Sequence, residues 1–267
     1  MTESDKIRVF EPILNEFETE EVKLWIQDMI KEIPDYIFDM PSSTTGKHHN
    51  KTQCMTHGQI YHILMFCAIA NYRLGLKYNK EKYPDPKRRD GMRCVGILHD
   101  AIKCGWENGR FTVHDHPILA SEWVLGSNME HDIDNELKEF IAGLCASHSG
   151  EWTTAKRGSK VVLPEPQTEE QMFCHECDYL ASRNNIDIEI PDYLAEIFAE
   201  HDAEAINNFD LDNYVLGFGK YKGYKLIDVY NEKPDYVAWM AESISRKDVQ
   251  DAIAALKQRI EEDDDEL

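Results

Sequence analysis

The sequence predicts a mainly α-helical fold with a small C-terminal α/β module. Over most of the first two hundred or so residues, apolar side chains recur at intervals of three and four, the period of a helix that buries one face. After about residue 205, aromatic segments punctuated by glycine, YVLGFGKYKGYKLIDVY, are more typical of short strands and turns. We therefore expect a helical domain over residues 1–204, the small module over 205–245, and a closing helix with an acidic tail over 246–267.

The first predicted helices differ in how much of their surface is apolar. Thr19 can cap an amphipathic helix that ends near Pro34. A polar loop follows over residues 41–56. The run GQIYHILMFCAIANYRLGL, residues 58–76, is apolar on nearly every side and indicates a helix buried deep in the domain, with His62 in its middle.

The later helices of this domain are shorter. MRCVGILHDAIKCG is interpreted as a buried helix that Gly105 ends, and Pro117 opens the next helix at a favoured first-turn position. A longer amphipathic helix follows over residues 133–144, and His148 continues its apolar face. The Cys-x-x-Cys pair at residues 174–177 lies on the apolar stripe of another helix. Because no second such pair completes a zinc site, we interpret it as two buried thiols.

Composition and charge restrict the function. The 267 residues hold 50 acidic and 29 basic side chains, a net charge of -21 that repels polyanions, so we expect a small substrate in preference to duplex DNA. The seven scattered cysteines indicate reduced thiols. No apolar run approaches the roughly 18 residues of a membrane span, and the first residues lack the features of a secretory signal. We therefore expect a cytoplasmic protein with no membrane partner.

Six polar side chains stand where a buried helix would normally carry hydrophobic residues. Buried charge is costly unless it is paired or coordinated, and a metal ion satisfies several such groups at once. Lys103, one turn beyond Asp100, can hold a phosphate near that ion. Any one of these histidines alone is also compatible with an ordinary core position. The six are His62, His99, Asp100, His116, His148 and Asp178.

The order of these residues, H, HD, H, H, D, resembles the HD-domain superfamily of metal-dependent phosphohydrolases. The segments LHDAIK, HPILASEWV, ASHSGEW and CDYLASR carry the resemblance, which covers residues 40–185. It implies a helical HD-domain bundle in which Asp100 bridges two ions and Lys103 stabilises charge on the phosphoryl group. Ile102 departs from the usual HDIGK glycine. The implied first-metal ligands are His62, His99, Asp100 and Asp178, and the implied second-metal ligands are His116 and His148.

Two loops add candidate substrate-binding residues. STTGKHHN resembles the S-x-GKYH-type loop of a bacterial and phage subset of HD proteins, with His48 where that subset often has Tyr. Loop cations are commonly solvated, but cations on two loops that flank the expected site can also clamp a phosphate. The candidates are Lys47, His49, Lys156 and Arg157.

A second resemblance concerns the C-terminal module. FGKYKGYKLIDV followed by PDYVAWM resembles the small module found after exodeoxyribonuclease X-type exonucleases. Lys220, Tyr221 and Lys222 alternate cations with an aromatic ring, a mixture suited to phosphate contact and base stacking along a single strand of nucleic acid. A hairpin with exposed lysines and core tyrosines explains the same pattern.

Together these features predict a metal-dependent phosphohydrolase that cleaves phosphate esters or anhydrides of nucleotides, as a nucleotidase or (d)NTP hydrolase, through a metal-activated water. We expect one or two divalent ions per chain, and mixed nitrogen and oxygen ligands suit manganese, iron, cobalt, nickel or zinc better than magnesium. Two alternatives stay open: a phosphodiesterase or 3'-5' exonuclease acting on single-stranded nucleic acid or cyclic nucleotides, and a metal-stabilised nucleotide-binding sensor. Assembly as a homo-oligomer is also left open.

Overall fold

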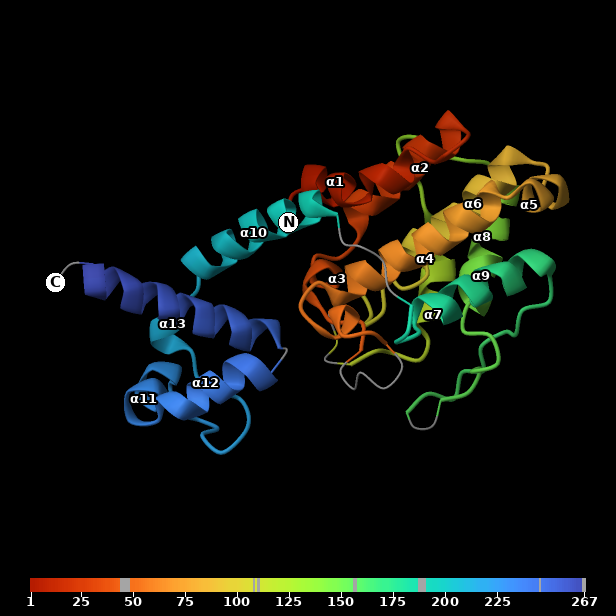
Figure 1. The fold of residues 1–267 in the computed structure, drawn as a ribbon. Coiled ribbons are helices and arrows are strands. Elements are labelled where there is room, and N and C mark those ends of the chain that lie inside the picture. The colour runs from red at the N-terminus through yellow and green to blue at the C-terminus, as the bar shows by residue number, and fades with distance from the viewer. Residues whose placement is uncertain are drawn as a thin grey trace. The chain divides into compact units, whose positions relative to one another are not determined.

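The chain divides into two compact units, Met1–Glu189 and Ile190–Leu267. Figure 1 draws the computed structural model, and each unit is described by itself. The described residues are mainly α-helical, as the sequence predicts, and none of them belongs to a β-strand of a sheet. No helix among them combines the length and apolar character that crossing a bilayer requires. The structure describes residues 1–43, 49–107, 109, 111–155, 158–186, 191–244 and 246–265, the last five of these as backbone only.

The first unit begins with three helices, α1 (Glu3–Leu14), α2 (Glu20–Glu32) and α3 (Tyr36–Asp39). Helix α1 is absent from the sequence prediction, because its apolar residues are concentrated in its C-terminal half. Its start is nevertheless well defined, since the Thr2 side chain accepts a hydrogen bond from the backbone N–H of Asp5. The buried faces of α1 and α2 pack against each other.

The start of α2 is attached to the centre of the unit through a buried carboxylate. Thr19 is the N-cap residue, as expected, but its hydroxyl donates to Asp90 Oδ2 at 2.7 Å instead of bonding to the helix. Asp90, fully buried on α6 (Pro86–Leu98), also accepts the backbone N–H groups of Glu18 and Thr19. Arg93 on the next turn pairs with the same carboxylate at 2.7 Å. This cluster therefore links α2 to α6.

Among the remaining helices of the first unit, α4 has an almost wholly apolar surface that is largely buried, as the sequence predicts. Helices α6 and α9 pack against α4, α8 packs against α6, and α7 packs against α8. These helices supply the side chains of the candidate site from several directions. Their bounds, with those of the short α5 and a 3-10 turn η1, are η1 Thr52–Cys54, α4 Gly58–Gly75, α5 Lys77–Lys82, α6 Pro86–Leu98, α7 His116–Gly126, α8 Asn135–Ser147 and α9 Glu169–Ala181.

Helix α6 differs from the expected helix at both ends. It begins six residues before Met92 at Pro86, because the Asp85 side chain accepts the N–H of Lys87 as an N-cap and proline suits the first turn. It ends at Leu98 and not near Gly105. From there the chain continues as successive tight turns, in which backbone N–H groups bond to the carbonyl three residues earlier.

The second unit is a small helical cluster, and the expected strands are not among its described residues. The segment between Val215 and Lys225 is a loop closed by a single antiparallel bridge between those two residues. Gly219 and Gly223, at φ 71° and 91°, turn the chain before a longer ladder can form. The expected closing helix is confirmed as α13. The element bounds are α10 Asp192–Asn207, η2 Leu211–Asn213, α11 Leu226–Glu232, α12 Pro234–Ser243 and α13 Lys247–Asp265.

Candidate metal centre

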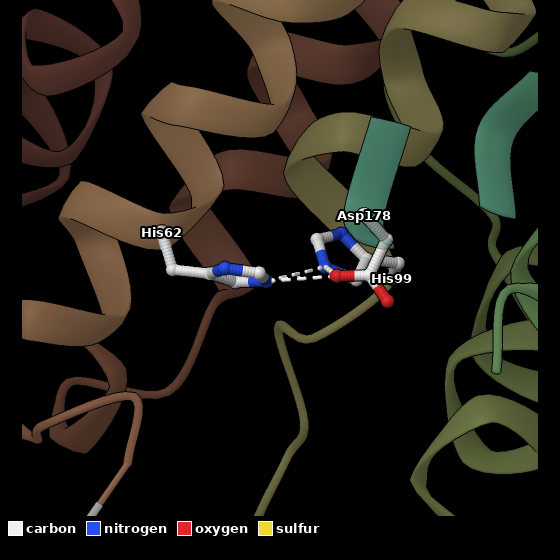
Figure 2. A group of neighbouring side chains, drawn as sticks. All are labelled: His62, His99 and Asp178. Carbon is white, nitrogen blue, oxygen red and sulfur yellow. Dashed lines mark hydrogen bonds and ion pairs between the residues drawn. The ribbon is translucent and has the colours of Figure 1, made fainter. Parts of the chain in front are cut away.

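Three of the predicted ligands come together from three different helices. His62 projects from the middle of α4, His99 follows the end of α6, and Asp178 lies on α9 (Figure 2). His62 Nε2 is 3.1 Å from Asp178 Oδ1 and 3.3 Å from His99 Nε2, and His99 Nε2 is 3.7 Å from the same oxygen. Ligand atoms about 2.0–2.2 Å from a shared ion lie at such separations from one another. We call these three residues group one.

The other three predicted ligands form a second group. Asp100 belongs to the turns after α6, His116 begins α7, and His148 caps the C-terminus of α8. Asp100 Oδ1 lies 2.9 Å from His116 Nε2 and 3.9 Å from His148 Nε2. The three ligand atoms all lie within 4.8 Å of one another, as they do in group one. We call these residues group two.

Asp100 lies between the two groups. Its Oδ1 belongs to group two, while its Oδ2 lies 3.6 Å from His62 Nε2 and 3.7 Å from His99 Nε2 of group one. One carboxylate therefore presents one oxygen atom to each group. This arrangement is suited to bridging two neighbouring ions.

Hydrogen bonds at the far nitrogen fix the tautomer of three of the histidines. In each, Nδ1 lies within hydrogen-bond distance of a backbone carbonyl three or four residues earlier in the chain. A carbonyl can only accept, so Nδ1 carries a proton and Nε2 is the nitrogen directed at the centre. His62 Nδ1 is buried and has no such partner among the described residues. The pairs are His99 with Val95 at 3.1 Å, His116 with Val113 at 2.7 Å and His148 with Cys145 at 2.7 Å.

The protonation states also suit metal ligation. Burial lowers the pKa of His99, and burial together with the nearby His99 lowers the pKa of His148 to about 3. Burial alone would raise the pKa of Asp100, but the charge of Lys103 and a hydrogen bond from His116 hold it well below its usual value. The hydrogen bond from His62 has the same effect on Asp178, again against the opposing effect of burial. The carboxylates are therefore ionised, and His99 and His148 are neutral, at neutral pH.

These residues fit a divalent ion in each group. His62 Nε2 and His99 Nε2 lie 3.3 Å apart, a separation that requires a cation or a proton between them. Two ionised carboxylates lie beside them, Asp100, which is buried, and Asp178, which is 22% exposed, with one ammonium group, that of Lys103. Each group thus offers two imidazole nitrogens and one carboxylate oxygen, a donor set that suits first-row transition ions.

A short polar network supports Asp100 from one side. Lys103 is buried, and its Nζ donates to Asp100 Oδ2 at 2.6 Å and to Gln59 Oε1 at 3.1 Å. Gln59 in turn donates from Nε2 to the same carboxylate oxygen at 3.1 Å, and Ser42 Oγ lies 3.4 Å from the ammonium group. The sequence analysis does not identify Gln59. The sequence feature that could have identified it is a polar amide within an apolar helix, three residues before His62, and the structure shows that this amide is fully buried.

Of the four predicted substrate-binding residues, His49 lies beside group one. Its ring is 5.4 Å from that of His62, and its Nδ1 is 2.7 Å from Gln53 Oε1. Burial first, and then the neighbouring His62, lowers its pKa to about 4, so its imidazole is neutral at pH 7. Lys47, Lys156 and Arg157 lie outside the described residues.

The ligands are not equally accessible. The Asp178 side chain is 22% exposed and that of His116 is 12% exposed, whereas the other four are at most 5% exposed. Among the six ligands, Asp178 and His116 are therefore the ones most exposed to solvent. The interpretation of the Cys-x-x-Cys pair as thiols is confirmed, since Cys174 and Cys177 are free and fully buried.

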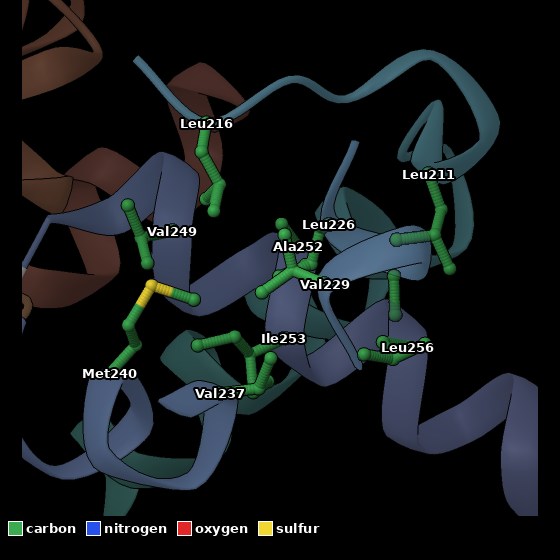
Figure 3. Close-up of a cluster of buried hydrophobic side chains, with 11 residues drawn as sticks. Leu211, Leu216, Leu226, Val229, Val237, Met240, Val249, Ala252, Ile253 and Leu256 are labelled. Atoms are coloured by element: carbon green, nitrogen blue, oxygen red, sulfur yellow. The ribbon is translucent and has the colours of Figure 1, made fainter. Parts of the chain in front are cut away.

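The candidate nucleic-acid residues lie on the loop before α11 in the second unit. Leu216 and Leu226, at the two ends of this loop, are held in the core of the unit (Figure 3). Lys220 and Lys222 are exposed. Tyr221 is half-buried, with its ring 4.8 Å from that of Tyr236 in an edge-to-face contact. The loop therefore exposes its cations and partly packs its central ring.

Comparison with known proteins gives one finding. Residues 216–245 match the family model described as exodeoxyribonuclease X-like C-terminal, as the sequence analysis expected for this stretch. No curated protein and no solved structure matches the chain. The match lies wholly in the second unit, and the resemblance of the first unit to HD domains rests on the residues described above.

Proposed function

We propose that the first unit is an HD-type phosphohydrolase that acts on nucleotides with two divalent ions held by groups one and two. The observation that carries the proposal is the position of Asp100, with one oxygen facing each group. A purely structural cluster of buried histidines has no need of such a bridge. A pair of ions sharing one carboxylate is the arrangement that stabilises both sides of an in-line displacement at phosphorus.

Ions bound at these groups would lower the pKa of a coordinated water and neutralise phosphate oxygens. The protein's own residues supply the rest. Asp100 and the histidine hydrogen bonds at Nδ1 would hold the geometry, and the Lys103 ammonium beside Asp100 would contact a phosphoryl oxygen. His49, neutral at pH 7, would donate or accept a hydrogen bond at the substrate.

Nucleotides are proposed as the substrate class for two reasons. The net charge of -21 disfavours long polyanions and leaves small phosphorylated molecules as the accessible class. The resemblance of residues 40–185 to HD domains points to phosphate esters and anhydrides. Which phosphates are removed depends on contacts with the rest of the substrate.

A hydrolysis screen tests the proposal. Protein loaded with Mn²⁺ or Co²⁺ is incubated with nucleoside mono-, di- and triphosphates and cyclic nucleotides, and the phosphorus product is identified. We expect hydrolysis of at least one class and its loss in Asp100→Asn, with Asp28→Asn, an acidic residue remote in sequence and outside both groups, as the control. If protein with two ions bound per chain hydrolyses none of them, the enzyme proposal is wrong and the nucleotide-sensor alternative is favoured.

The exodeoxyribonuclease X-like segment favours a second candidate, in which the same centre cleaves a phosphodiester at the end of a single strand. In that case Lys220 and Lys222 would contact the strand backbone, because both are exposed on one loop. Short single-stranded oligonucleotides added to the same screen separate the two. Release of mononucleotides supports the second candidate, and no cleavage of any oligonucleotide excludes it.

A further inference from the structure

An exposed aromatic pair includes Tyr179, the residue that follows the metal ligand Asp178 in α9. The rings of Trp152 and Tyr179 lie within 5° of parallel, with centroids 5.9 Å apart. Trp152 is 53% exposed and Tyr179 is 39% exposed. Large aromatic side chains cost free energy when they stay in water, so an exposed pair in ordered contact indicates a surface that a ligand can cover.

This pair is attached directly to the metal ligands. Tyr179 follows Asp178 in α9, and Asp178 is the most exposed ligand. The ring of His175, one turn before Tyr179, lies 5.8 Å from Trp152, and its Nδ1 is 2.8 Å from the backbone carbonyl of His148. The aromatic surface is thus connected to group one through Tyr179 and to group two through His175.

A cation completes the surface. The guanidinium of Arg183 lies over Tyr179, with Cζ 4.1 Å from the ring centroid, and its Nη2 donates to Ser182 Oγ at 2.8 Å. Stacked aromatic and guanidinium planes are the groups on which planar bases stack in proteins that bind single nucleotides and strands. A phosphate group does not stack on aromatic rings, whereas an uncharged planar base does.

We infer that Trp152 and Tyr179, supported by Arg183, form a stacking surface for the base of a nucleotide whose phosphate reaches the metal centre. The inference rests on the proposed function and extends it, because it assigns the residues that distinguish nucleotides from other phosphate esters. His175 acts as a positioning residue, since it joins Trp152 to the turn that carries His148. The surface recognises the ring shape common to all bases, so it confers a preference for nucleotides without selecting one base.

Calorimetric titration tests the inference independently of turnover. Full-length protein loaded with Mn²⁺ is titrated with each of the four nucleoside 5'-monophosphates and with ribose 5-phosphate, which lacks only the base, all as non-hydrolysable phosphonate analogues. Because stacking of one base contributes a factor of roughly 10 or more in affinity, at least one nucleotide is expected to bind that much more tightly than ribose 5-phosphate. Trp152→Ala and Tyr179→Ala should remove this difference and leave ribose 5-phosphate binding unchanged.

Two further variants keep the test specific. Trp152→Phe retains a ring and should retain most of the nucleotide preference. Tyr72→Ala removes an equally large, exposed ring from α4 and should change nothing. A nucleotide preference that survives in both Trp152→Ala and Tyr179→Ala, or that is absent from the wild-type protein, overturns the inference.

The failure of the proposed function has a different signature. If neither ribose 5-phosphate nor any nucleotide binds the metal-loaded protein, the phosphate site is wrong. The stacking surface is then tested alone by saturation-transfer NMR with adenosine at millimolar concentration. Saturation transfer to the base that Trp152→Ala abolishes supports the surface, and its absence in the wild-type protein overturns it.

Discussion

The ammonium of Lys103 lies 2.6 Å from Asp100 Oδ2, the oxygen that faces group one. Both side chains are buried, and Gln59 bonds to both of them. The lysine therefore fixes the orientation of the carboxylate, and in the proposed function its positive charge would also contact a phosphoryl oxygen. These two roles can be separated by experiment.

Replacing Lys103 by methionine removes the charge and keeps the length of the side chain. We expect kcat to fall by about two orders of magnitude, because a preorganised charge in a buried site stabilises developing negative charge strongly. Metal content should stay at the wild-type level, since Lys103 offers no ligand. Steady-state kinetics and metal analysis of the same preparations measure both. Lys31→Met, which removes a lysine paired with Asp28 outside the centre, serves as the control.

The turn after α8 gives a prediction about how the second group is held. Gly150 has φ 62°, and a Cβ built there would lie 2.1 Å from the ring of His175. Gly150→Ala therefore combines backbone strain with displacement of a side chain that contacts the carbonyl of His148.

Gly158→Ala is a matched control for this change, because Gly158 also has positive φ but has nothing within 4 Å of the added Cβ. Both variants put an alanine at a positive φ, so backbone strain is common to them and only Gly150→Ala also displaces a side chain. We expect Gly150→Ala to be less stable than Gly158→Ala by about 1–3 kcal/mol, the cost of forcing a side chain out of a packed site. Urea unfolding of both variants measures the difference, and equal stabilities would show that His175 moves aside without cost.

The ion pairs of Glu18 with Arg89 and Arg93 on α6 predict that the free energy of unfolding depends on pH. Hydrogen bonds from Arg89 above all, and from Arg93, lower the pKa of Glu18 to about 2, below the usual value of 4.5. A lowered carboxyl pKa stabilises the folded state above the unfolded pKa, and the stabilisation disappears as pH falls from about 4.5 towards 2. Glu18→Gln should therefore cost about 1–2 kcal/mol at pH 7 and progressively less below pH 4.5.

Unfolding free energies measured by urea between pH 3 and 7 check this dependence. Glu81→Gln removes one carboxylate of the exposed Lys77–Glu81 pair and should change stability by less than about 0.5 kcal/mol at every pH. A constant difference between Glu18→Gln and wild type over the whole range would contradict the account.

The exposed lysines of the second unit predict the salt dependence of strand binding. If Lys220 and Lys222 each contact one phosphate of a single strand, Lys220→Ala/Lys222→Ala should reduce the slope of log K against log salt by about 1.4, or 0.7 per contact. Fluorescence anisotropy with a labelled oligonucleotide measures the slope. Lys77→Ala/Lys80→Ala removes two exposed lysines from α5 and should leave it unchanged. An unaltered slope in Lys220→Ala/Lys222→Ala would remove this loop from strand binding.

The sequence was most informative where polar residues interrupt apolar helices. His62, His148 and Asp178 each occupy a helical position that packing would otherwise give to a hydrophobic residue, and the structure brings them to one place. The same reasoning could have identified Gln59, whose amide is equally buried. The sequence analysis did not include Gln59 because an amide is not a metal ligand of the expected type.

Other features depend on contacts that no local pattern records. The strands predicted near Lys220 are absent from the described residues, where the structure has a loop closed by one bridge. Aromatic residues between glycines are compatible with a tight loop on a helical core as well as with a hairpin. Trp152 and Trp123 are alike in sequence terms, yet Trp152 is exposed against Tyr179 while Trp123 is buried. Only the packing of α9 against the turn after α8 distinguishes a surface ring from a core ring.

In the function proposed for the first unit, two neighbouring groups hold one ion each and share Asp100. The most direct measurement is the metal content per chain, by mass spectrometry of the elements after loading with Mn²⁺ or Co²⁺ and removal of free ions. Wild-type protein should hold two ions, while His62→Ala and His116→Ala, each of which removes a ligand from one group only, should each hold about one. Asp100→Ala should hold fewer than either. No bound ion in the folded wild-type protein, or a full complement of ions in Asp100→Ala, would contradict the account.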